Sequence, residues 1–197
     1  MKQKNFTLLL STLICFASCK KDAVQPSGNQ NVTSLKVTSS VPAINQDASG
    51  IDTTKGYFRV QLAKDAVNTD EALVEFNPKA KATFVRNEDA VTFQGFGSVS
   101  LSSMSSDNVP LAINTLPLST KGVTIKLKVS ATASDIYKLN LEDVHAIPQK
   151  YDIWLMDKYR KDSLDFRHNL TYAFNLNTKD TSSYGSNRFS IVVREHH

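Results

Sequence analysis

Hydrophobic and polar residues alternate with a period of two along most of the chain after residue 56. The clearest run is GVTIKLKVSA, residues 122–131, where every second residue from Val123 to Val129 is apolar and those between are polar. This period places the apolar side chains on one face of a β-strand. The same alternation predicts six more strands, at residues 58–62, 72–76, 137–141, 153–155, 170–176 and 189–193. Strands with one apolar and one polar face are typical of antiparallel sheets.

Turn-forming segments separate these strands. They include FNPKAK, SMSSDNVP, STKG, ATASD, KYRKDS and YGSN. Strands recur every 10 to 18 residues and no run of ten or more residues keeps a helical period, which favours an all-β fold over a βαβ fold. We therefore predict that residues 56–197 form an antiparallel β-sandwich of jelly-roll or immunoglobulin type, with about eight to ten strands in two packed sheets.

The N-terminus has the pattern of a secretory signal. Lys2 and Lys4 precede an apolar run over residues 6–17. At about 12 residues this run is too short for a permanent transmembrane helix, which needs about 20. We therefore predict that residues 1–18 are a signal peptide that is removed on export.

Both cysteines of the chain lie at the end of this segment. A conventional signal peptidase prefers small residues at positions −3 and −1, and a cut before Cys19 would place the bulky Phe16 at −3. The residues FASC, 16–19, resemble the bacterial lipobox, in which a large apolar residue and two small residues precede the cysteine. The resemblance implies that Cys19 becomes the acylated first residue and that Cys15 leaves with the signal. A conventional cut after Ala17, which would release a free secreted chain, is the alternative.

A polar segment follows the cysteine. Residues 20–55 are rich in Ser, Thr, Asn, Gln and Pro, and such a composition buries too little apolar surface to order the backbone. As a flexible coil, about 35 residues span roughly 30 Å. We predict that residues 19–55 are a lipidated cysteine and a flexible tether, with room for one short strand at residues 35–41.

Composition and charge exclude one class of partner. With 41% hydrophobic and 21% charged residues, the chain has an ordinary globular composition. Removing Lys2 and Lys4 from its 23 basic residues leaves 21 against 19 acidic ones, a net charge of +2, and these charges are interspersed. A nucleic-acid surface needs clustered positive charge, so we predict no nucleic-acid partner.

The common catalytic signatures are absent from the sequence. It contains no HExxH, GxSxG, P-loop or GxGxxG motif, and each of these motifs carries a specific chemistry. In EDVHA, residues 142–146, Asp143 and His145 would share one face of a strand, where they could bind a metal or relay a proton. The ordinary interpretation of that pattern is a polar strand end in solvent. We predict no catalytic residue, no metal ligand, no cofactor and no enzymatic activity.

Scattered carboxylates and one tryptophan remain as candidate site residues. Glycosidase-like carboxylate pairs could form among Asp152, Asp157, Asp162 and Asp165, although 19 acidic residues on a surface produce such pairs by chance. Trp154 is the only tryptophan, and it faces outward if Ile153 and Leu155 face the core. An exposed Trp154 is a possible ligand contact that stacks on a sugar or anchors a protein; packing beneath the loop that follows is the alternative.

Five segments together carry a resemblance to a known family. They are DEALVEFNPKAKATF, VPLAINTLP, YKLNLEDV, YDIWLMDKYRKDSLDFRHNLTYAFNL and NRFSIVV. Over residues 57–194 these resemble a β-sandwich module of large surface and secreted proteins of Bacteroidota, which commonly lies before a type IX secretion sorting domain. The resemblance implies an antiparallel sandwich without known catalytic residues. It also suggests that Asn114 and Arg188 pair with each other or hold a turn.

The chain differs from that family at its ends. It reaches His197 without a sorting domain, so we expect a lipid anchor on Cys19 in place of type IX export. The whole pattern predicts a cell-surface or outer-membrane lipoprotein whose non-catalytic sandwich serves adhesion, scaffolding or binding. Its partners would be the membrane, through the lipid, and a glycan or cell-envelope protein. A carbohydrate-binding accessory of polysaccharide uptake is the alternative, and a hydrolase is a third hypothesis that rests on the scattered acids and His145.

Overall fold

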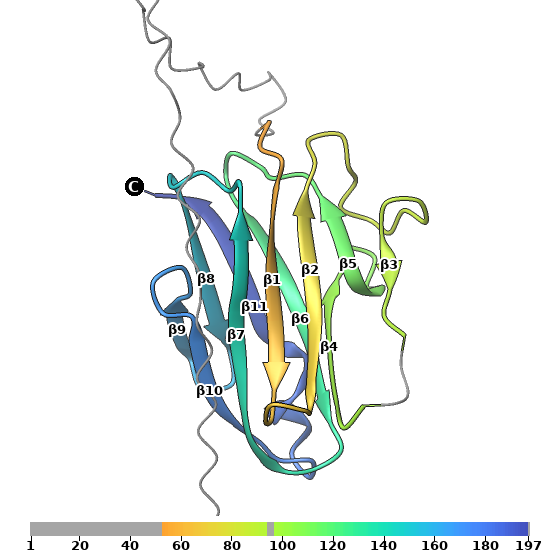
Figure 1. Cartoon of the computed structure of the whole chain (residues 1–197), viewed down its shortest axis with the longest axis vertical. Helices are drawn as coiled ribbons and strands as arrows, with labels where there is room; N and C mark the ends of the chain where they lie inside the picture. The colour runs from red at the N-terminus through yellow and green to blue at the C-terminus, as the bar shows by residue number, and fades with distance from the viewer. Residues whose placement is uncertain (1–52, 94–96, 197) are drawn as a thin grey trace, which may run out of the picture. The chain divides into compact units, whose positions relative to one another are not determined.

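The computed structural model describes residues 53–93 and 97–196, and strands make up most of this part of the chain (Figure 1). The predicted all-β class is confirmed. Eleven strands lie in the described residues, with a single helical turn, η1 (Thr181–Ser183). The strands are β1 (Gly56–Ala63), β2 (Thr69–Phe76), β3 (Ala90–Val91), β4 (Val99–Met104), β5 (Pro110–Leu116), β6 (Val123–Ala131), β7 (Asp135–His145), β8 (Tyr151–Asp157), β9 (Asp162–Asp165), β10 (Thr171–Leu176) and β11 (Gly185–Glu195). The predicted signal, Cys19 and the strand at 35–41 lie outside the described residues.

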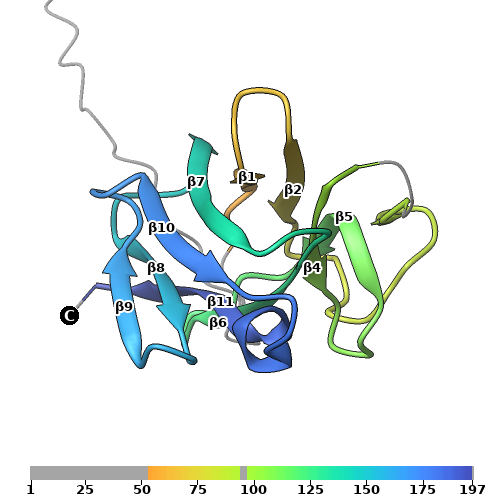
Figure 2. The same ribbon diagram turned by 90° about the horizontal axis from the view of Figure 1, so that it is seen from below.

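All strands belong to one mixed sheet. Its order is β10-β7-β1-β2-β5-β4-β6-β11-β8-β9, and β3 pairs with β5 at the side. Figure 2 shows this sheet folded back on itself, with β10, β7, β1 and β2 facing β8, β11 and β6. The sheet is nearly closed and resembles a barrel more than two separate sheets, because β5 and β4 carry the hydrogen bonding from one wall to the other. One neighbouring pair, β2 and β5, is parallel, which the predicted antiparallel sandwich did not include.

The predicted alternation fills the interior between the walls. On β6, Ile125, Leu127 and Val129 are at most 2% exposed, as the period of two requires. The largest fully buried side chains are aromatic: Tyr137, Tyr151, Phe58, Phe166, Phe174 and Phe189. Burying one large apolar side chain contributes about 1.5–3 kcal/mol, so these rings supply much of the free energy that holds the walls together.

The alternating pattern does not predict β3, β4, β5 or β9, and the turn segments SMSSDNVP and KYRKDS overlap the ends of β4 and β9. In β4, VSLSSM, the buried positions include Ser102 and Ser103, so polarity does not follow burial. The Ser103 hydroxyl donates to the Leu111 carbonyl at 3.3 Å and is thereby satisfied inside the sheet. A buried hydroxyl with a backbone partner costs little, which explains why a serine-rich strand is tolerated here.

The two ends of the domain differ in what they carry. β1 begins at Gly56, beside His145 at the end of β7, and this entry end also holds the last residue of β11, Glu195, which pairs with Tyr151. At the opposite end, called here the distal end, lie the turns at residues 64–68, 132–134 and 158–161 and the segment 177–184. In Figure 1 the entry end is at the top and the β1–β2 turn at the bottom.

Candidate functional site

A buried ion pair organises the distal end. Asp157, at the end of β8, is 1% exposed, and Arg188, on β11, is 3% exposed. The Arg188 Nη2 donates to Asp157 Oδ2 at 2.8 Å and its Nε to Oδ1 at 3.1 Å. Its Nη1 donates to the carbonyls of Asn175 and Ser183. Arg188 therefore pairs with Asp157 rather than with Asn114, and it holds the 177–184 segment through that segment's backbone.

The same carboxylate orders the β8–β9 turn. Asp157 Oδ1 accepts the backbone N–H of Tyr159 at 3.0 Å and that of Arg160 at 3.2 Å. An aspartate that accepts hydrogen bonds from the backbone two and three residues ahead stabilises a turn. Tyr172 donates its hydroxyl to Asp157 Oδ2 at 3.1 Å. Burial, together with the negative charge of Asp157, raises the pKa of Tyr172 to about 12.

Three aromatic rings surround the Arg188 guanidinium. Its carbon lies 4.6 Å from the centre of the Phe189 ring, 4.8 Å from that of Phe174 and 4.9 Å from that of Tyr159. Such cation–π contacts are strongest where the cation is removed from water. Phe174 and Phe189 belong to the core, whereas Tyr159 covers the guanidinium from outside and is 50% exposed.

Tyr159 is held at both ends of its side chain. The turn that carries it is fixed by Asp157, and its hydroxyl donates to Asp180 Oδ2 at 2.9 Å. This hydrogen bond raises the pKa of Tyr159 and lowers that of Asp180. Because Asp180 belongs to the segment that precedes η1, the bond joins the two turns of the distal end. The result is a fixed aromatic ring with half of its surface open to solvent.

A hollow of about 530 Å³, called here the distal pocket, lies beside this ring. It is lined by Lys158 and Tyr159 from the β8–β9 turn, and by residues 181–182 and 184–188 from η1 and the start of β11. The volume is within the range of small-ligand pockets. Among its lining residues, Thr181, Ser186 and Asn187 have hydroxyl or amide groups that make no hydrogen bond within the described residues.

Positive charge gathers around the distal pocket. Lys158, Arg160, Lys161 and Lys179 are all exposed and lie in the two turns that Tyr159 and Asp180 join. None of the four forms an ion pair with any residue in the ranges 53–93 and 97–196. Of the acids beside them, Asp157 and Asp180 are already bonded to Arg188 and Tyr159, and Asp162 contacts the Tyr172 hydroxyl at 3.4 Å. This end of the domain therefore presents unpaired cations, although the charges along the sequence are mixed.

Trp154, the predicted ligand contact, is half-buried on the outer face of β8. Its neighbours Ile153 and Leu155 face the core, as expected. The Arg194 guanidinium of β11 lies over its ring at 5.6 Å, and its Nε1 is buried without a hydrogen-bond partner. The contact that covers Trp154 thus comes from the neighbouring strand as well as from its own hairpin, and the ring is less open than that of Tyr159.

Asp143 and His145 share one face of β7, as predicted, and both contact Tyr57 of β1. The Tyr57 hydroxyl donates to Asp143 Oδ2 at 3.0 Å, which raises the pKa of Tyr57. The His145 ring stacks on the Tyr57 ring with centres 5.2 Å apart. A bulge at Glu142 turns both residues to the outer face. Within the described ranges no group of three His, Cys, Asp or Glu residues could hold a metal.

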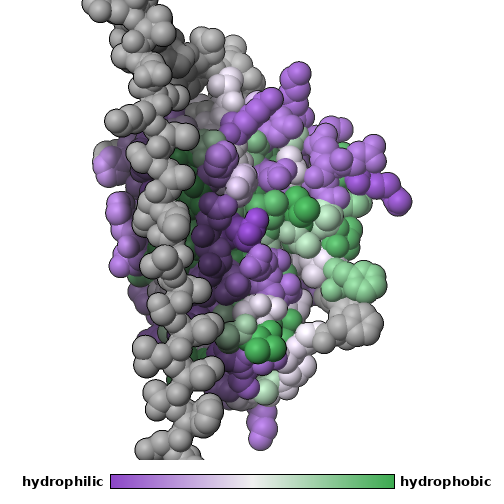
Figure 3. Space-filling model, in the orientation of Figure 1, coloured by the Kyte–Doolittle hydropathy of each residue, from purple (hydrophilic) through white to green (hydrophobic). Residues whose placement is uncertain are grey.

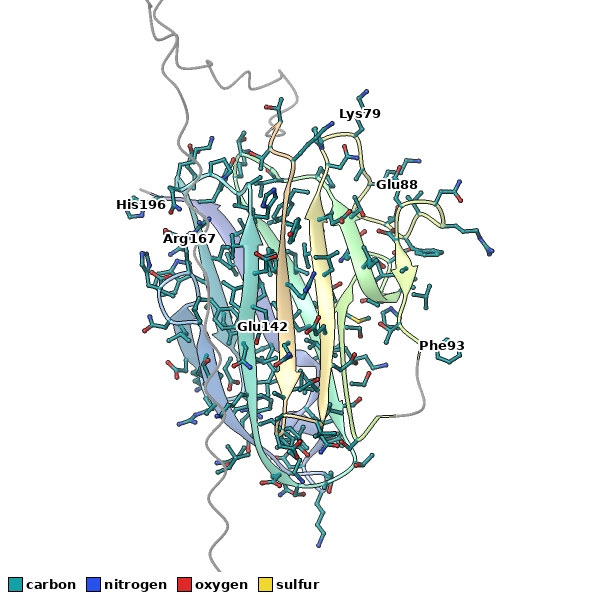
Figure 4. All side chains as sticks on the ribbon, in the orientation of Figure 1. Lys79, Glu88, Phe93, Glu142, Arg167 and His196 are labelled. Carbon is teal, nitrogen blue, oxygen red and sulfur yellow. The ribbon has the colours of Figure 1, made fainter. Side chains whose placement is uncertain are left out.

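A second hollow, of about 430 Å³, adjoins this cluster. Glu142 and Asp143 line it from β7, and Arg167 lines it from the loop after β9. Figure 4 shows Glu142 on β7, and Arg167 nearer the entry end. Burial lowers the pKa of Arg167, and its outer nitrogens donate to Gln149 and to the Pro148 carbonyl. These hydrogen bonds join the β9–β10 loop to the β7–β8 loop.

Two of the four aspartates proposed as carboxylate pairs have separate partners, and the other two share one. Asp165 contacts His168 at 2.7 Å and Asp152 contacts His196 at 3.4 Å. Asp162 approaches the Tyr172 hydroxyl at 3.4 Å, so that this hydroxyl lies between Asp157 and Asp162. Asp157 is buried and bonded to Arg188, so it cannot contact an external substrate.

Sequence reasoning missed Tyr159, Asp180 and the distal pocket. The turn that carries Tyr159 lies within the predicted turn KYRKDS, but no turn is predicted at Asp180, because the predicted turn YGSN begins only after η1. The contact between the two turns depends on a pairing across 31 residues, from Asp157 to Arg188. The local signal was the pair of aspartates, Asp157 and Asp180, each of which is followed by a turn, because such residues order turns.

Comparison with protein-family models, curated proteins and solved structures finds no match for this chain. The resemblance to the Bacteroidota module therefore stays a hypothesis. A search of residues 53–93 and 97–196 for a helix that could cross a membrane finds none.

Proposed function

We propose that the chain is a lipoprotein of the bacterial cell envelope, anchored through acyl chains on Cys19, with a non-catalytic β-domain that binds a partner through its distal pocket. The observation that carries the binding role is the position of this pocket. It lies at the end of the domain opposite the point where the chain enters β1, and it contains a fixed, half-exposed aromatic ring.

The anchor rests on the lipobox at residues 16–19 and on the polar segment that follows it. Each buried methylene contributes about 0.8 kcal/mol, and two or three acyl chains make a durable anchor. The domain would be tethered to the outer membrane, on the cell surface or on the periplasmic face. The similarity to modules of Bacteroidota surface proteins supports this location.

β1 runs from the entry end of the domain to its distal end. β1 has eight residues, which at about 3.3 Å per residue span roughly 26 Å. The distal pocket therefore lies roughly that length from the point where the chain enters β1.

The chemistry of the pocket favours binding over catalysis. Asp157 and Asp180 are bonded to Arg188 and Tyr159, so neither is placed as a free general acid or base. The remaining groups are hydroxyls, one amide, the aromatic rings of Tyr159 and Tyr184 and the exposed cations, which suit recognition of a ligand. Adhesion, scaffolding and capture of a ligand are all served by such a surface.

A carbohydrate-binding accessory of polysaccharide uptake is the second candidate. The exposed half of the Tyr159 ring favours it, because sugars stack on flat aromatic faces. Trp154, the residue first proposed for this role, is half-buried beneath Arg194 and is the weaker platform. A glycan array with the Trp154→Ala and Tyr159→Ala proteins separates the two sites. A hydrolase has less support, since its best carboxylate pair includes the buried Asp157.

Membrane fractionation of two cysteine variants tests the anchor. The Cys19→Ala protein is expected to lose its membrane association, because the acylated residue is gone. The Cys15→Ala protein is the matched control and is expected to stay in the membrane, since Cys15 leaves with the signal. Recovery of Cys19→Ala in the membrane fraction at the wild-type level would reject the proposal.

A further inference from the structure

The distal pocket combines a stacking surface with an anion-binding rim. Tyr159 lies against the Arg188 guanidinium with one face, its hydroxyl is bonded to Asp180, and half of its surface is exposed. Because the ring is already fixed, a ligand that stacks on it loses little additional side-chain entropy on binding. Flat aromatic rings of this kind suit the C–H faces of sugar rings.

Neutral polar groups lie next to this ring. Thr181, Ser186 and Asn187 line the pocket and make no hydrogen bond in the part of the chain that the structure describes. Their hydroxyl and amide groups can both donate and accept, as sugar hydroxyls do. The pocket therefore offers hydrogen-bonding partners around a stacking face.

The rim adds positive charge. Lys158 lines the distal pocket and also a neighbouring hollow of about 440 Å³, which Lys161 and Asp162 line as well. The two hollows adjoin at Lys158, so a chain longer than one sugar could contact both. Arg160 and Lys179 lie in the same turns, and no described carboxylate pairs with any of the four cations.

From these contacts we infer that the distal pocket binds an acidic glycan, with carboxylate or sulfate groups on its sugars. The inference rests on the proposed binding role of this domain. Tyr159 stacks on one sugar, the free hydroxyl and amide groups bond its neighbouring hydroxyls, and Lys158 and Lys161 contact the acidic substituents. An acidic peptide is the competing ligand; it fits less well because the pocket has few apolar side chains to receive those of a peptide.

Calorimetric titration of the full-length protein in detergent micelles tests this inference. The probes are an oligogalacturonate, a sulfated chondroitin oligosaccharide, a neutral cello-oligosaccharide and polyglutamate. At least one of the two acidic glycans is expected to bind at least about tenfold more tightly than the neutral one, and more tightly than polyglutamate. Binding should weaken as salt rises, because exposed charges are screened. The comparison of the two acidic glycans identifies carboxylate or sulfate as the preferred group.

Three variants locate the binding. Tyr159→Ala is expected to lower the affinity about tenfold or more, and the double variant Lys158→Gln, Lys161→Gln to lower it by a similar factor with a weaker salt dependence. Lys138→Gln, which removes an exposed cation on β7, is the matched control and should bind as the wild type does. The lysine variants lie outside the buried network, so they test the site even if Tyr159→Ala unfolds.

Several results would overturn the inference. These are the absence of binding to both acidic glycans, equal binding to the neutral glycan or to polyglutamate, or affinities unchanged in the tyrosine and lysine variants. None of these affects the anchor, which the Cys19→Ala fractionation tests separately. Tight binding of polyglutamate that the lysine variants abolish would instead leave the pocket as a binding site for an acidic peptide.

Discussion

Asp157 and Arg188 form a buried ion pair that connects β8 to β11 and fixes both turns of the distal end. The Asp157 carboxylate accepts hydrogen bonds from Arg188, Tyr172 and two backbone N–H groups, and Arg188 donates to the carbonyls of Asn175, in β10, and Ser183, in η1. A buried pair with all its donors satisfied adds less to the free energy of folding than it would cost to break. The pair therefore acts mainly to hold the ring of Tyr159 and the distal pocket in one arrangement.

Breaking this pair from either side should be costly. Asp157→Asn leaves the Arg188 charge buried without a counter-charge, and Arg188→Met leaves the Asp157 carboxylate buried without one. Each substitution is expected to lower the free energy of unfolding by about 3–5 kcal/mol. The double variant should lose less than the sum of the two, because the residues contact each other. Urea denaturation measures all three.

Glu71→Gln is the control for that series. Glu71 forms a surface ion pair with Arg59 at 3.7 Å, with both side chains more than 40% exposed, and such pairs contribute little. A loss for Asp157→Asn no larger than that for Glu71→Gln would contradict the account of the distal end.

The hydroxyl of Tyr172 gives the domain a specific response to alkaline pH. Its pKa is raised from 10.0 to about 12, so folding favours the neutral form. The resulting stabilisation is complete below pH 10 and is lost as the pH rises through 12, with an upper limit of about 3 kcal/mol for two pKa units. The Tyr172→Phe protein should lack this component, and its stability should fall less steeply between pH 10 and 12. Parallel curves for the two proteins would contradict the assignment.

Two glycines with positive φ provide a matched pair. Gly122 has φ +91° and a Cβ there would lie 2.6 Å from the Val193 carbonyl oxygen, whereas Gly185 has φ +85° and open space around it. Gly185→Ala should lower the free energy of unfolding by about 1–2 kcal/mol from backbone strain alone. Gly122→Ala should lower it by clearly more, because the added methyl group also clashes with β11. Thermal unfolding measures the difference, and equal costs would contradict the close approach at Gly122.

The fluorescence of Trp154 reports on one location, because it is the only tryptophan of the chain. Arg194→Ala is expected to shift its emission to longer wavelength and to increase quenching by acrylamide, since Arg194 lies over the ring. Ligand binding at the distal pocket should leave this emission unchanged. A strong spectral change on ligand binding, lost in Trp154→Phe, would place the ligand at Trp154 instead.

Exposed apolar residues lie in and beside β3. Figure 3 shows a hydrophobic area over β3 and β5. Val91, in β3, and Phe93, just after it, are 53% and 87% exposed. β3 has only two residues, which are too few for an alternating pattern to predict the strand.

What the sequence could and could not predict follows from the range of each interaction. The period of two between Val123 and Val129 identified β6 correctly, because side-chain alternation is a local property of a strand. β4 was not recognised, because Ser103 is buried with a hydroxyl bonded to the Leu111 carbonyl. The distal pocket could not be predicted from the sequence either, because it depends on the contact between Arg188 and Asp157, which lie 31 residues apart on neighbouring strands. Asp143 and His145 were placed correctly on one face, but their partner Tyr57 lies 86 residues before Asp143 in the sequence.

The mass of the mature protein tests the central claim most directly. Protein extracted with detergent from the membranes of a bacterial host that processes lipoproteins is expected to begin at Cys19, and its mass should exceed that of residues 19–197 by two or three acyl chains and their glyceryl group. A protein that begins at Ser18 without added mass, recovered from the soluble fraction, would contradict the account of a lipid-anchored binding module.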